Sequence, residues 1–379
     1  MSNTGTVEAW VYSNRSYPSD DGSIKYRSIV SKWTDGSCGG GNEGYLLDWY
    51  GTNAAGTLRG MICNGTNFQT VASSTNLVPN TWNHIVFAWD GAYLRLYMNG
   101  RPVGAPIAQT INSQDDSSML WIGDGFNSGT TYRWDGKLDQ VQIYNYARTP
   151  AQIAWDYNRG KPIGWWKMDE GEGTAVHDES GSGNHGTMTN MDAGSDWVEG
   201  KYNKALDFDG TDDYISIPDA NQYDFGINDF SLSAWVYRPS GGKSSPGIFS
   251  KNSNPGYRLR LSSSDLVLGL YDGTWHEYGS VNFGFQDDRW QHILVTLDRD
   301  GQAAFYLNGQ LKSSSNISAV ASINLNNSVP LLLGDDSWCR LSYCGQFIGK
   351  LDDVRIYNYV LTEQQIKQIQ NDGAIRYGE

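Results

Sequence analysis

The chain has 379 residues and a formal net charge of −14 at pH 7, so nucleic acid and anionic membrane surfaces would repel it. No apolar run reaches the roughly 18 residues of a membrane span. The opening MSNTG lacks the features of a signal peptide, and we expect this end to be a cut inside a longer protein.

The composition is that of a β-sandwich with many turns. Glycine occurs 44 times, aromatic residues make up 13% of the chain, and charged residues only 18%. Helical periodicity is confined to two short segments, whereas alternation typical of strands recurs throughout. The length is sufficient for about two domains, each with its own core.

The first predicted strands follow one another closely from the start of the chain. They are VEAWVY (7–12), IVSKW (29–33), GYLLDWY (44–50), TWNHIVFAWD (81–90), LYMNG (96–100) and LWIGDG (120–125). The Asn99-Gly100 pair after an alternating run predicts a two-residue turn between antiparallel strands. These elements indicate one antiparallel sandwich.

The segment 136–153 predicts a strand followed by one short helix. Thr149 and Gln152 fit a helix N-cap with its capping box, Pro150 suits the first helical position, and Gly160 lies just past the far end. We therefore expect the first domain, residues 1–160, to close with this helix.

The same series of segments then recurs in the same order. The segment 349–366 matches 136–153 at twelve of eighteen positions with an offset of 213 (349 − 136), and Asn308-Gly309 repeats the tight turn. This agreement indicates a tandem repeat, with residues 161–379 as the second domain. The second repeat has 71 residues (161–231) before its first matching strand and the first repeat has six (1–6), so we expect the first to lack its opening strands and to have unpaired sheet edges.

The chain contains four cysteines, two in each repeat. Their positions favour disulfides over free thiols, and an oxidising, extracellular setting. The expected pairs are Cys38 with Cys63 and Cys339 with Cys344.

Several motifs together resemble the bacterial laminin-G-like, concanavalin A-like jelly-roll family. The motifs are WWKMDEGEGTAVHDESGSGNHGT (165–187), KALDFDGTDDYISIP (204–218), LSAWV (232–236), RWQHI (289–293), YLNG (306–309) and GKLDDVRIYNYVLT (349–362). The resemblance implies two tandem antiparallel sandwiches, usually modules of large secreted or surface proteins that often bind carbohydrate. It does not specify the ligand.

The family often holds a calcium ion, and one aspartate supports this expectation independently. Asp352 alternates with Val354 and Ile356, which predicts a carboxylate turned toward the core, where a cation would offset its burial. The resemblance implies that Ca²⁺ is bound by Asp178, by oxygens of Gly183, Asn184 or His185, and by Asp352. The alternative is a solvated loop and an aspartate bound by backbone amides. Asp139 stands in the place of Asp352 in the first repeat, where no loop completes a site.

Carbohydrate binding requires exposed aromatic rings with polar neighbours. Aromatic positions that differ between the repeats are candidates for ligand binding, because a core shared by both repeats does not require them. The alternative for each residue is a role in packing. In domain one they are Trp33, Trp49 and Trp134. In domain two they are Tyr271, Trp275, His276, Tyr278, Trp338, Arg340 and Tyr343.

Catalysis is not expected. Relatives that cleave β-glucans carry alternating carboxylates on one strand, and the acidic residues of MDEGEG (168–173) are interrupted by glycines. The sequence therefore predicts a non-enzymatic module that binds a glycan or a cell-surface or matrix protein. The rival prediction is a structural spacer or assembly module that self-associates by adding a strand to the incomplete first domain, for which the tail 374–379 is one candidate; a glycoside hydrolase of the same fold is the third possibility.

Overall fold

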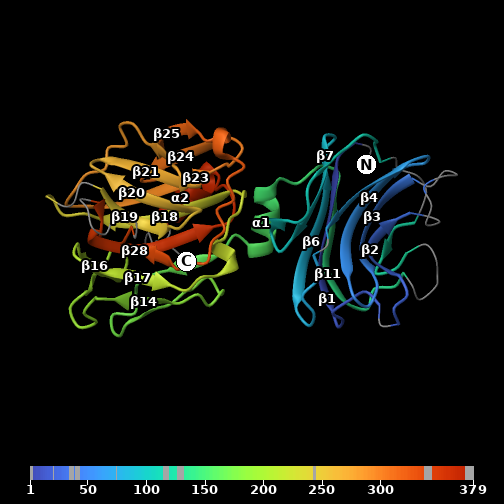
Figure 1. Cartoon of the computed structure of the whole chain (residues 1–379), viewed down its shortest axis with the longest axis horizontal. Coiled ribbons are helices and arrows are strands. Elements are labelled where there is room, and N and C mark those ends of the chain that lie inside the picture. The colour runs from blue at the N-terminus through green and yellow to red at the C-terminus, as the bar shows by residue number, and fades with distance from the viewer. Residues whose placement is uncertain are drawn as a thin grey trace, which may run out of the picture. The chain divides into compact units, whose positions relative to one another are not determined.

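The computed structural model describes residues 3–19, 21–33, 38, 43–73, 75–113, 119–125, 132–241, 245–336 and 344–371. The chain divides between Gly160 and Lys161 into two compact units. Each unit is an antiparallel β-sandwich whose last strand is followed by a short α-helix (Figure 1). The predicted fold class is confirmed.

Unit one consists of two facing sheets. The first has the strand order β11-β1-β6-β7-β8 with β9 also paired to β7, and the second has the order β10-β2-β3-β4-β5. The elements are β1 (Gly5–Ser13), β2 (Lys25–Lys32), β3 (Glu43–Gly51), β4 (Gly56–Asn64), β5 (Phe68–Ser73), β6 (Trp82–Trp89), β7 (Tyr93–Met98), β8 (Arg101–Pro102), β9 (Ile107–Ala108), β10 (Trp121–Ile122), β11 (Gly136–Tyr144) and α1 (Pro150–Asn158).

Alternation along β3 shows how the sequence separates the two faces of the second sheet. Tyr45, Leu47 and Trp49 are buried in the core between the sheets. Leu46 and Asp48, one residue out of phase, therefore lie on the opposite face. This outer face of β2 to β5 carries the candidate site described below.

Unit two repeats this plan with additional strands. Its sheets have the orders β15-β16-β28-β18-β23-β24-β25, with β12 also paired to β28, and β13-β14-β17-β26-β19-β20-β21-β22, with β27 also paired to β19. Its first elements are β12 (Gly164–Trp166), β13 (Ala175–Val176), β14 (Gly186–Thr189), β15 (Trp197–Glu199), β16 (Lys204–Asp209), β17 (Tyr214–Ile217), the 3₁₀ turn η1 (Asn221–Tyr223), β18 (Phe230–Tyr237), β19 (Ser245–Lys251) and β20 (Gly256–Ser262). The remaining elements are β21 (Asp265–Tyr271), β22 (Trp275–Gly279), β23 (Trp290–Leu297), β24 (Gln302–Leu307), β25 (Gln310–Asn316), η2 (Ser318–Val320), β26 (Leu331–Leu333), β27 (Cys344–Gly345), β28 (Ile348–Tyr357) and α2 (Glu363–Asn371).

The local signals at the turns and helix starts are confirmed. Asn99 and Gly100 both have positive φ (52° and 74°) and form the two-residue turn between β7 and β8. At the start of α1, the Gln152 backbone N–H donates to Thr149 Oγ1 (3.2 Å) while the Thr149 N–H donates to Gln152 Oε1 (3.0 Å). The same reciprocal pair, Thr362 with Gln365, precedes α2.

A β-bulge in β28 changes the orientation predicted for Asp352. Asp353 has φ of 48°, and the pairing with β18 shifts register at this point. Leu351 and Val354 therefore both face the core, and Asp352 lies opposite Trp235 on the other face of the sheet. The prediction that Asp352 points toward the core is wrong, because simple alternation does not hold across a bulge.

Candidate functional site

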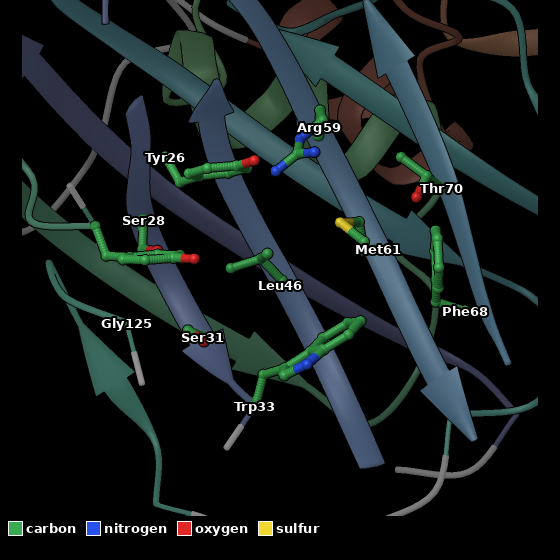
Figure 2. Close-up of a pocket in the computed structure, with 11 residues that line it drawn as sticks. Tyr26, Ser28, Ser31, Trp33, Leu46, Arg59, Met61, Phe68, Thr70 and Gly125 are labelled. Carbon is green, nitrogen blue, oxygen red and sulfur yellow. The ribbon is translucent and has the colours of Figure 1, made fainter. Parts of the chain in front are cut away.

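A pocket of about 270 Å³ lies on the outer face of β2 to β5 in unit one (Figure 2). We call it the β2–β5 pocket. It is lined by Tyr26, Ser28, Ser31, Trp33, Leu46, Arg59, Met61, Phe68, Thr70, Gly125 and Tyr132. Four of these residues form one row across the strands, because Ser31, Leu46, Met61 and Thr70 are successive partners in register. The pocket is thus built on paired strands, and the register of β2 with β3 shifts between Ser28 and Val30.

Arg59 supplies a fixed positive charge at the wall of the β2–β5 pocket. Its Nε donates to Asp48 Oδ1 at 3.0 Å and its Nη2 to Asp48 Oδ2 at 2.5 Å, so the pair is bidentate. Burial of the guanidinium disfavours its charge, but the Asp48 carboxylate outweighs burial and raises the pKa of Arg59. Arg59 therefore stays charged.

Tyrosine rings surround Arg59. The guanidinium carbon lies 4.2 Å from the ring centroid of Tyr50 and 5.4 Å from that of Tyr26, distances typical of cation–π contacts. Tyr26 in turn stacks on Tyr132, with centroids 5.2 Å apart and planes 13° apart. Sequence reasoning missed Tyr26, Tyr132 and Arg59. Comparison of the two repeats could have identified Tyr26, because the second repeat has Ser245 at the equivalent position.

The opposite end of the β2–β5 pocket is apolar and exposed. Phe68 is 60% exposed, while Leu46 and Met61 form the surface beside it (Figure 2). Ser28 adds a buried hydroxyl for which the described residues supply no hydrogen-bond partner. A ligand there would meet aromatic rings, one cation and an unsatisfied hydroxyl.

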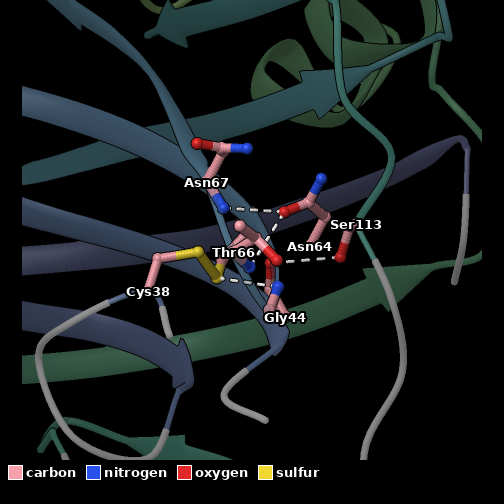
Figure 3. The surroundings of a disulfide bond; sticks show 8 residues. Cys38, Gly44, Asn64, Thr66, Asn67 and Ser113 are labelled. Atoms are coloured by element: carbon pink, nitrogen blue, oxygen red, sulfur yellow. Dashed lines mark hydrogen bonds between the residues drawn. A yellow bond between two sulfur atoms is a disulfide. The ribbon is translucent and has the colours of Figure 1, made fainter. Parts of the chain in front are cut away.

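The predicted Cys38–Cys63 disulfide is present (Figure 3). Trp33, Met61 and Cys63 form a buried cluster with Cys38 packed against it. The turn after Cys63 is closed by Asn64, whose Oδ1 accepts the backbone N–H groups of Thr66 (3.1 Å) and Asn67 (2.8 Å). The disulfide therefore supports the Trp33 end of the pocket. The predicted Cys339–Cys344 pair lies outside the described residues, apart from the backbone of Cys344.

In unit two the equivalent face is filled by charged side chains. The row Ser31, Leu46, Met61 and Thr70 corresponds by register to Ser250, Arg258, Gly269 and Glu277. The Arg258 guanidinium binds Asp336 at 2.6 Å and Glu277 at 2.7 Å and lies 3.6 Å from the ring centroid of Trp275. It occupies the space that is open in unit one.

This network accounts for most of the aromatic candidates predicted in unit two. Trp275 is covered by Arg258, and Tyr271 is buried and contacts Trp275, with ring centroids 4.8 Å apart. Tyr278 packs against the core, and His276 Nε2 lies 3.1 Å from Asp272 Oδ1. None of these four residues lines the β2–β5 pocket. The remaining candidates, Trp338, Arg340 and Tyr343, lie outside the described residues.

The three tryptophans predicted in unit one have different environments. Trp33 lines the β2–β5 pocket, as expected for a ligand-binding residue. Trp49 is only 1% exposed and lies in the core, so its assignment to a ligand surface is wrong; it alternates in phase with Tyr45 and Leu47. Trp134 is half-buried against the same core, and its Nε1 donates to the Lys137 carbonyl at 3.3 Å.

The loop expected to hold calcium is ordered by Asp178 through backbone amides. Asp178 Oδ1 accepts the N–H groups of Trp165 (3.0 Å) and Ser180 (2.9 Å), and Oδ2 accepts that of Asn184 (3.0 Å). The Asp178 N–H donates to His185 Nδ1 at 3.0 Å. Gly183 has positive φ (76°), as the tight loop requires. Three amide donors stabilise the Asp178 carboxylate.

Asp352 contacts a different part of the chain. It is 1% exposed, and its Oδ2 accepts the Tyr202 N–H at 2.8 Å, whereas Oδ1 lacks a hydrogen-bond partner among the described residues. Burial raises the pKa of Asp352 to about 8, assisted by the nearby carboxylates of Asp353 and Asp169. In unit one the equivalent Asp139 is exposed and accepts the Gln140 N–H.

The residues predicted to share one ion have different hydrogen-bond partners, with the Asp178 carboxylate bound by three backbone amides and Asp352 bound by Tyr202. A calcium ion shared by these residues stays a prediction. Asp352 Oδ1 is buried without a hydrogen-bond partner among the described residues, so it is the oxygen that a bound cation would contact. Three carboxylates with oxygens within 4.8 Å of one another occur elsewhere in the described chain, at Asp209, Asp212 and Asp213.

Comparison with known families is consistent with this architecture. A laminin-G-type family model, described as the concanavalin A-like lectin/glucanases superfamily, matches residues 1–154 and 209–367. The chain belongs to this superfamily. The resemblance inferred from the sequence motifs is confirmed, and one matched segment falls in each unit. The superfamily, by its name, includes lectins and glucanases.

Curated relatives in this group are much longer proteins. Botulinum neurotoxin type E of Clostridium butyricum is 24% identical over 161 residues, which is 38% of this chain and 13% of the toxin. Adhesion G-protein coupled receptor V1 of Danio rerio is 24% identical over 157 residues, which is 39% of this chain and 2% of the receptor. The chain therefore aligns with only a small part of each.

Among solved structures, the binding domain of Paraclostridial Mosquitocidal Protein 1 has 17% identity and a TM-score of 0.46, covering 56% of this chain and 52% of that one. Domain 4 of AbnA, a GH43 extracellular arabinanase from Geobacillus stearothermophilus, in complex with arabinotriose, has 21% identity and a TM-score of 0.43, covering 55% of this chain and 98% of that one. Across the described residues, neither helix has the length and apolar character of a membrane span.

Proposed function

We propose that this chain is a non-catalytic carbohydrate-binding module that acts outside the cell, and that the β2–β5 pocket is its sugar site. The observation that carries the proposal is the difference between the two units. The row of residues that is open in unit one is closed in unit two by Arg258 and its ion pairs. If the superfamily fold itself required particular residues on this outer face, the two units would carry similar residues there.

The chemistry of the β2–β5 pocket suits a sugar. Aromatic rings at Tyr26, Trp33 and Phe68 offer apolar surfaces for the C–H faces of a pyranose or furanose ring. Arg59 and Ser28 offer a charged donor and a hydroxyl for sugar hydroxyls. At about 270 Å³ the pocket is at the small end of ligand sites, which favours one sugar unit of a longer glycan.

The same pocket is poorly suited to glycoside hydrolysis. Its described lining residues include no Asp or Glu, and the nearest carboxylate, Asp48, lies beneath Arg59 and is bound by it. Retaining glycosidases require two carboxyl groups about 5 Å apart at the scissile bond. Binding without cleavage is therefore the activity that these residues support.

The extracellular setting is supported by the Cys38–Cys63 disulfide, because disulfides persist mainly in oxidising compartments. The partner we propose is a glycan; a cell-surface or matrix protein is the alternative. Calcium remains a proposal, and it is supported at Asp352 by the Oδ1 atom that has no hydrogen-bond partner among the described residues.

The test is a glycan array on the full chain, followed by calorimetry with the best ligand. Phe68→Ala removes an exposed ring from the pocket, and Tyr93→Ala removes a ring of similar exposure (42%) from the opposite sheet. We expect Phe68→Ala to weaken binding at least tenfold and Tyr93→Ala to leave it unchanged. A blank array, or equal effects of the two substitutions, would remove the proposed function.

A further inference from the structure

Two strands of unit one have an outer edge to which no described strand is paired. β10 ends one sheet and β11 ends the other. In unit two the equivalent strands, β26 and β28, are both covered by one continuous segment, residues 204–217. Its first half, β16, pairs with β28, and its second half, β17, pairs with β26. Unit two therefore shows what kind of segment can pair with both edge strands.

The side chains along β10 are those that the covering segment would bury. Leu120 and Ile122 are 45% and 54% exposed, whereas their equivalents Leu331 and Leu333 are fully buried. In unit two, Leu333 lies opposite Ile215 of the covering segment. Two exposed aliphatic residues on either side of Trp121 at a sheet edge are unusual at a water-exposed surface, because such edges promote pairing with another strand.

The β11 edge shows the same contrast with identical residue types. Leu138, Val141 and Ile143 are only partly buried, although Leu351, Val354 and Ile356 at the same places in β28 are 0% exposed. Here the residues are unchanged and only the covering strands differ: β16 pairs with β28 at Leu351, and β12 pairs with it at Val354 and Ile356. The exposure on unit one is thus a property of the open edge.

Trp134 of unit one corresponds to a residue of unit two that contacts an aromatic ring of the covering segment. Its backbone N–H donates to the Gly123 carbonyl, as that of Phe347 does to the Gly334 carbonyl in unit two, so the two residues are equivalent. In unit two Phe347 packs edge-on against Phe208 of the covering segment, with ring centroids 5.8 Å apart. Trp134, half-buried, lies where an incoming aromatic side chain would pack.

We propose that unit one binds, across the edges of β10 and β11, a polypeptide segment with the pattern of residues 204–217. The segment pairs first with β11 and places an aromatic side chain on Trp134. It then turns through an acidic, glycine-containing stretch and pairs with β10, covering Leu120 and Ile122. The interaction is β-strand addition to both sheets of one sandwich.

The charge of Lys137 and the backbone geometry of β11 further restrict which segment can bind. Lys137 is the equivalent of Lys350, which lies opposite Asp207 of the covering segment, so the incoming strand carries an acidic residue at that position. Gln140, with φ of 46°, repeats the bulge at Asp353 and interrupts the β11 edge. A short strand on 136–138 fits this edge, whereas the long, straight β11 of a second copy does not.

The probe is a fluorescein-labelled peptide with the sequence of residues 203–218, titrated into the full chain and followed by anisotropy. We expect saturable binding, and protection of β10 and β11 amides from hydrogen exchange in its presence. A peptide carrying Leu206→Asp and Phe208→Asp loses both apolar contacts with the core and serves as the control ligand.

The matched protein variants are Ile122→Lys, on the proposed surface, and Val281→Lys, which alters an exposed aliphatic residue (73%) in unit two. We expect Ile122→Lys to weaken peptide binding at least tenfold and Val281→Lys to have no effect. Equal binding to all three proteins would overturn the proposal. So would a dimer of the chain that dissociates in Ile122→Lys but not on addition of peptide, because the surface would then belong to a second copy.

Discussion

Arg59 in β4 lies directly opposite Asp48 in β3, and its guanidinium binds both oxygens of a fully buried carboxylate. This pair on the outer face of the sheet fixes one wall of the β2–β5 pocket, because Arg59 then holds its place between Tyr26 and Tyr50. The ligand surface thus depends on a side chain that does not itself reach the pocket.

Asp48→Asn should destabilise unit one by about 3 kcal/mol, because it leaves the largely buried guanidinium of Arg59 without its counter-charge. Replacing both partners by apolar residues, in Asp48→Leu with Arg59→Met, should cost less than the single substitution. Chemical denaturation followed by tryptophan fluorescence measures both. If the double variant is instead less stable than Asp48→Asn, the ion pair contributes more stability than two apolar residues do at these positions.

Removing the disulfide should loosen the Trp33 end of the pocket. The bond closes a loop with a sequence separation of 25, for which the chain-entropy relation gives about 3.5 kcal/mol. We expect Cys38→Ala with Cys63→Ala to lower the melting temperature of unit one and to weaken glycan binding, while the unfolding transition of unit two provides an internal reference. An unchanged melting temperature would show that the bond does not constrain unit one.

The stability of unit two should depend on pH through Asp352. Its pKa is raised to about 8 in the folded state, so the folded state holds the proton more tightly than the unfolded state does. The resulting stabilisation is complete below about pH 4 and is lost as the pH rises to about 8. Asp352→Asn should flatten this part of the profile and be more stable than the wild type at pH 9. Parallel profiles from pH 4 to 9 would contradict the assignment.

The effect of calcium on the melting temperature should depend on Asp352 and not on Asp178, the two carboxylates that the sequence predicted to share one site. If a cation satisfies the orphaned Oδ1 of Asp352, calcium at pH 7.5 should raise the melting temperature of the wild type, and a chelator should reverse the effect. The rise should vanish in Asp352→Asn and persist in Asp178→Asn, because Asp178 is already bound by three amides. A response lost only in Asp178→Asn would restore the loop as the site.

Local sequence signals predicted the fold well, and alternation failed where the backbone departs from regularity. The Asn99-Gly100 turn and the Thr149 cap depend on residues within four positions of one another, so the sequence alone determines them. The orientation of Asp352 depends on a bulge that a two-residue period does not show. Trp49 could have been placed in the core from its phase with Leu47.

The pocket was predicted only through Trp33 because its other members come together across strands. Tyr26 meets Arg59 only when β2, β3 and β4 are paired in register, and Tyr132 joins them from a distant loop. Comparison of the two repeats at every outward position, rather than at tryptophans alone, would have identified Tyr26. Arg59, opposite Val267 in the repeat alignment, would also have been found.

The most direct measurement of the central claim is glycan binding by a variant that closes the pocket as unit two does. Leu46→Arg with Thr70→Glu recreates the Arg258 and Glu277 pair at the matching positions of unit one, which lie on either side of Met61 in the row. We predict that this variant keeps the wild-type melting temperature and loses calorimetric binding of the glycan identified on the array. Binding with unchanged affinity in the closed variant would contradict the assignment of the β2–β5 pocket as the sugar site.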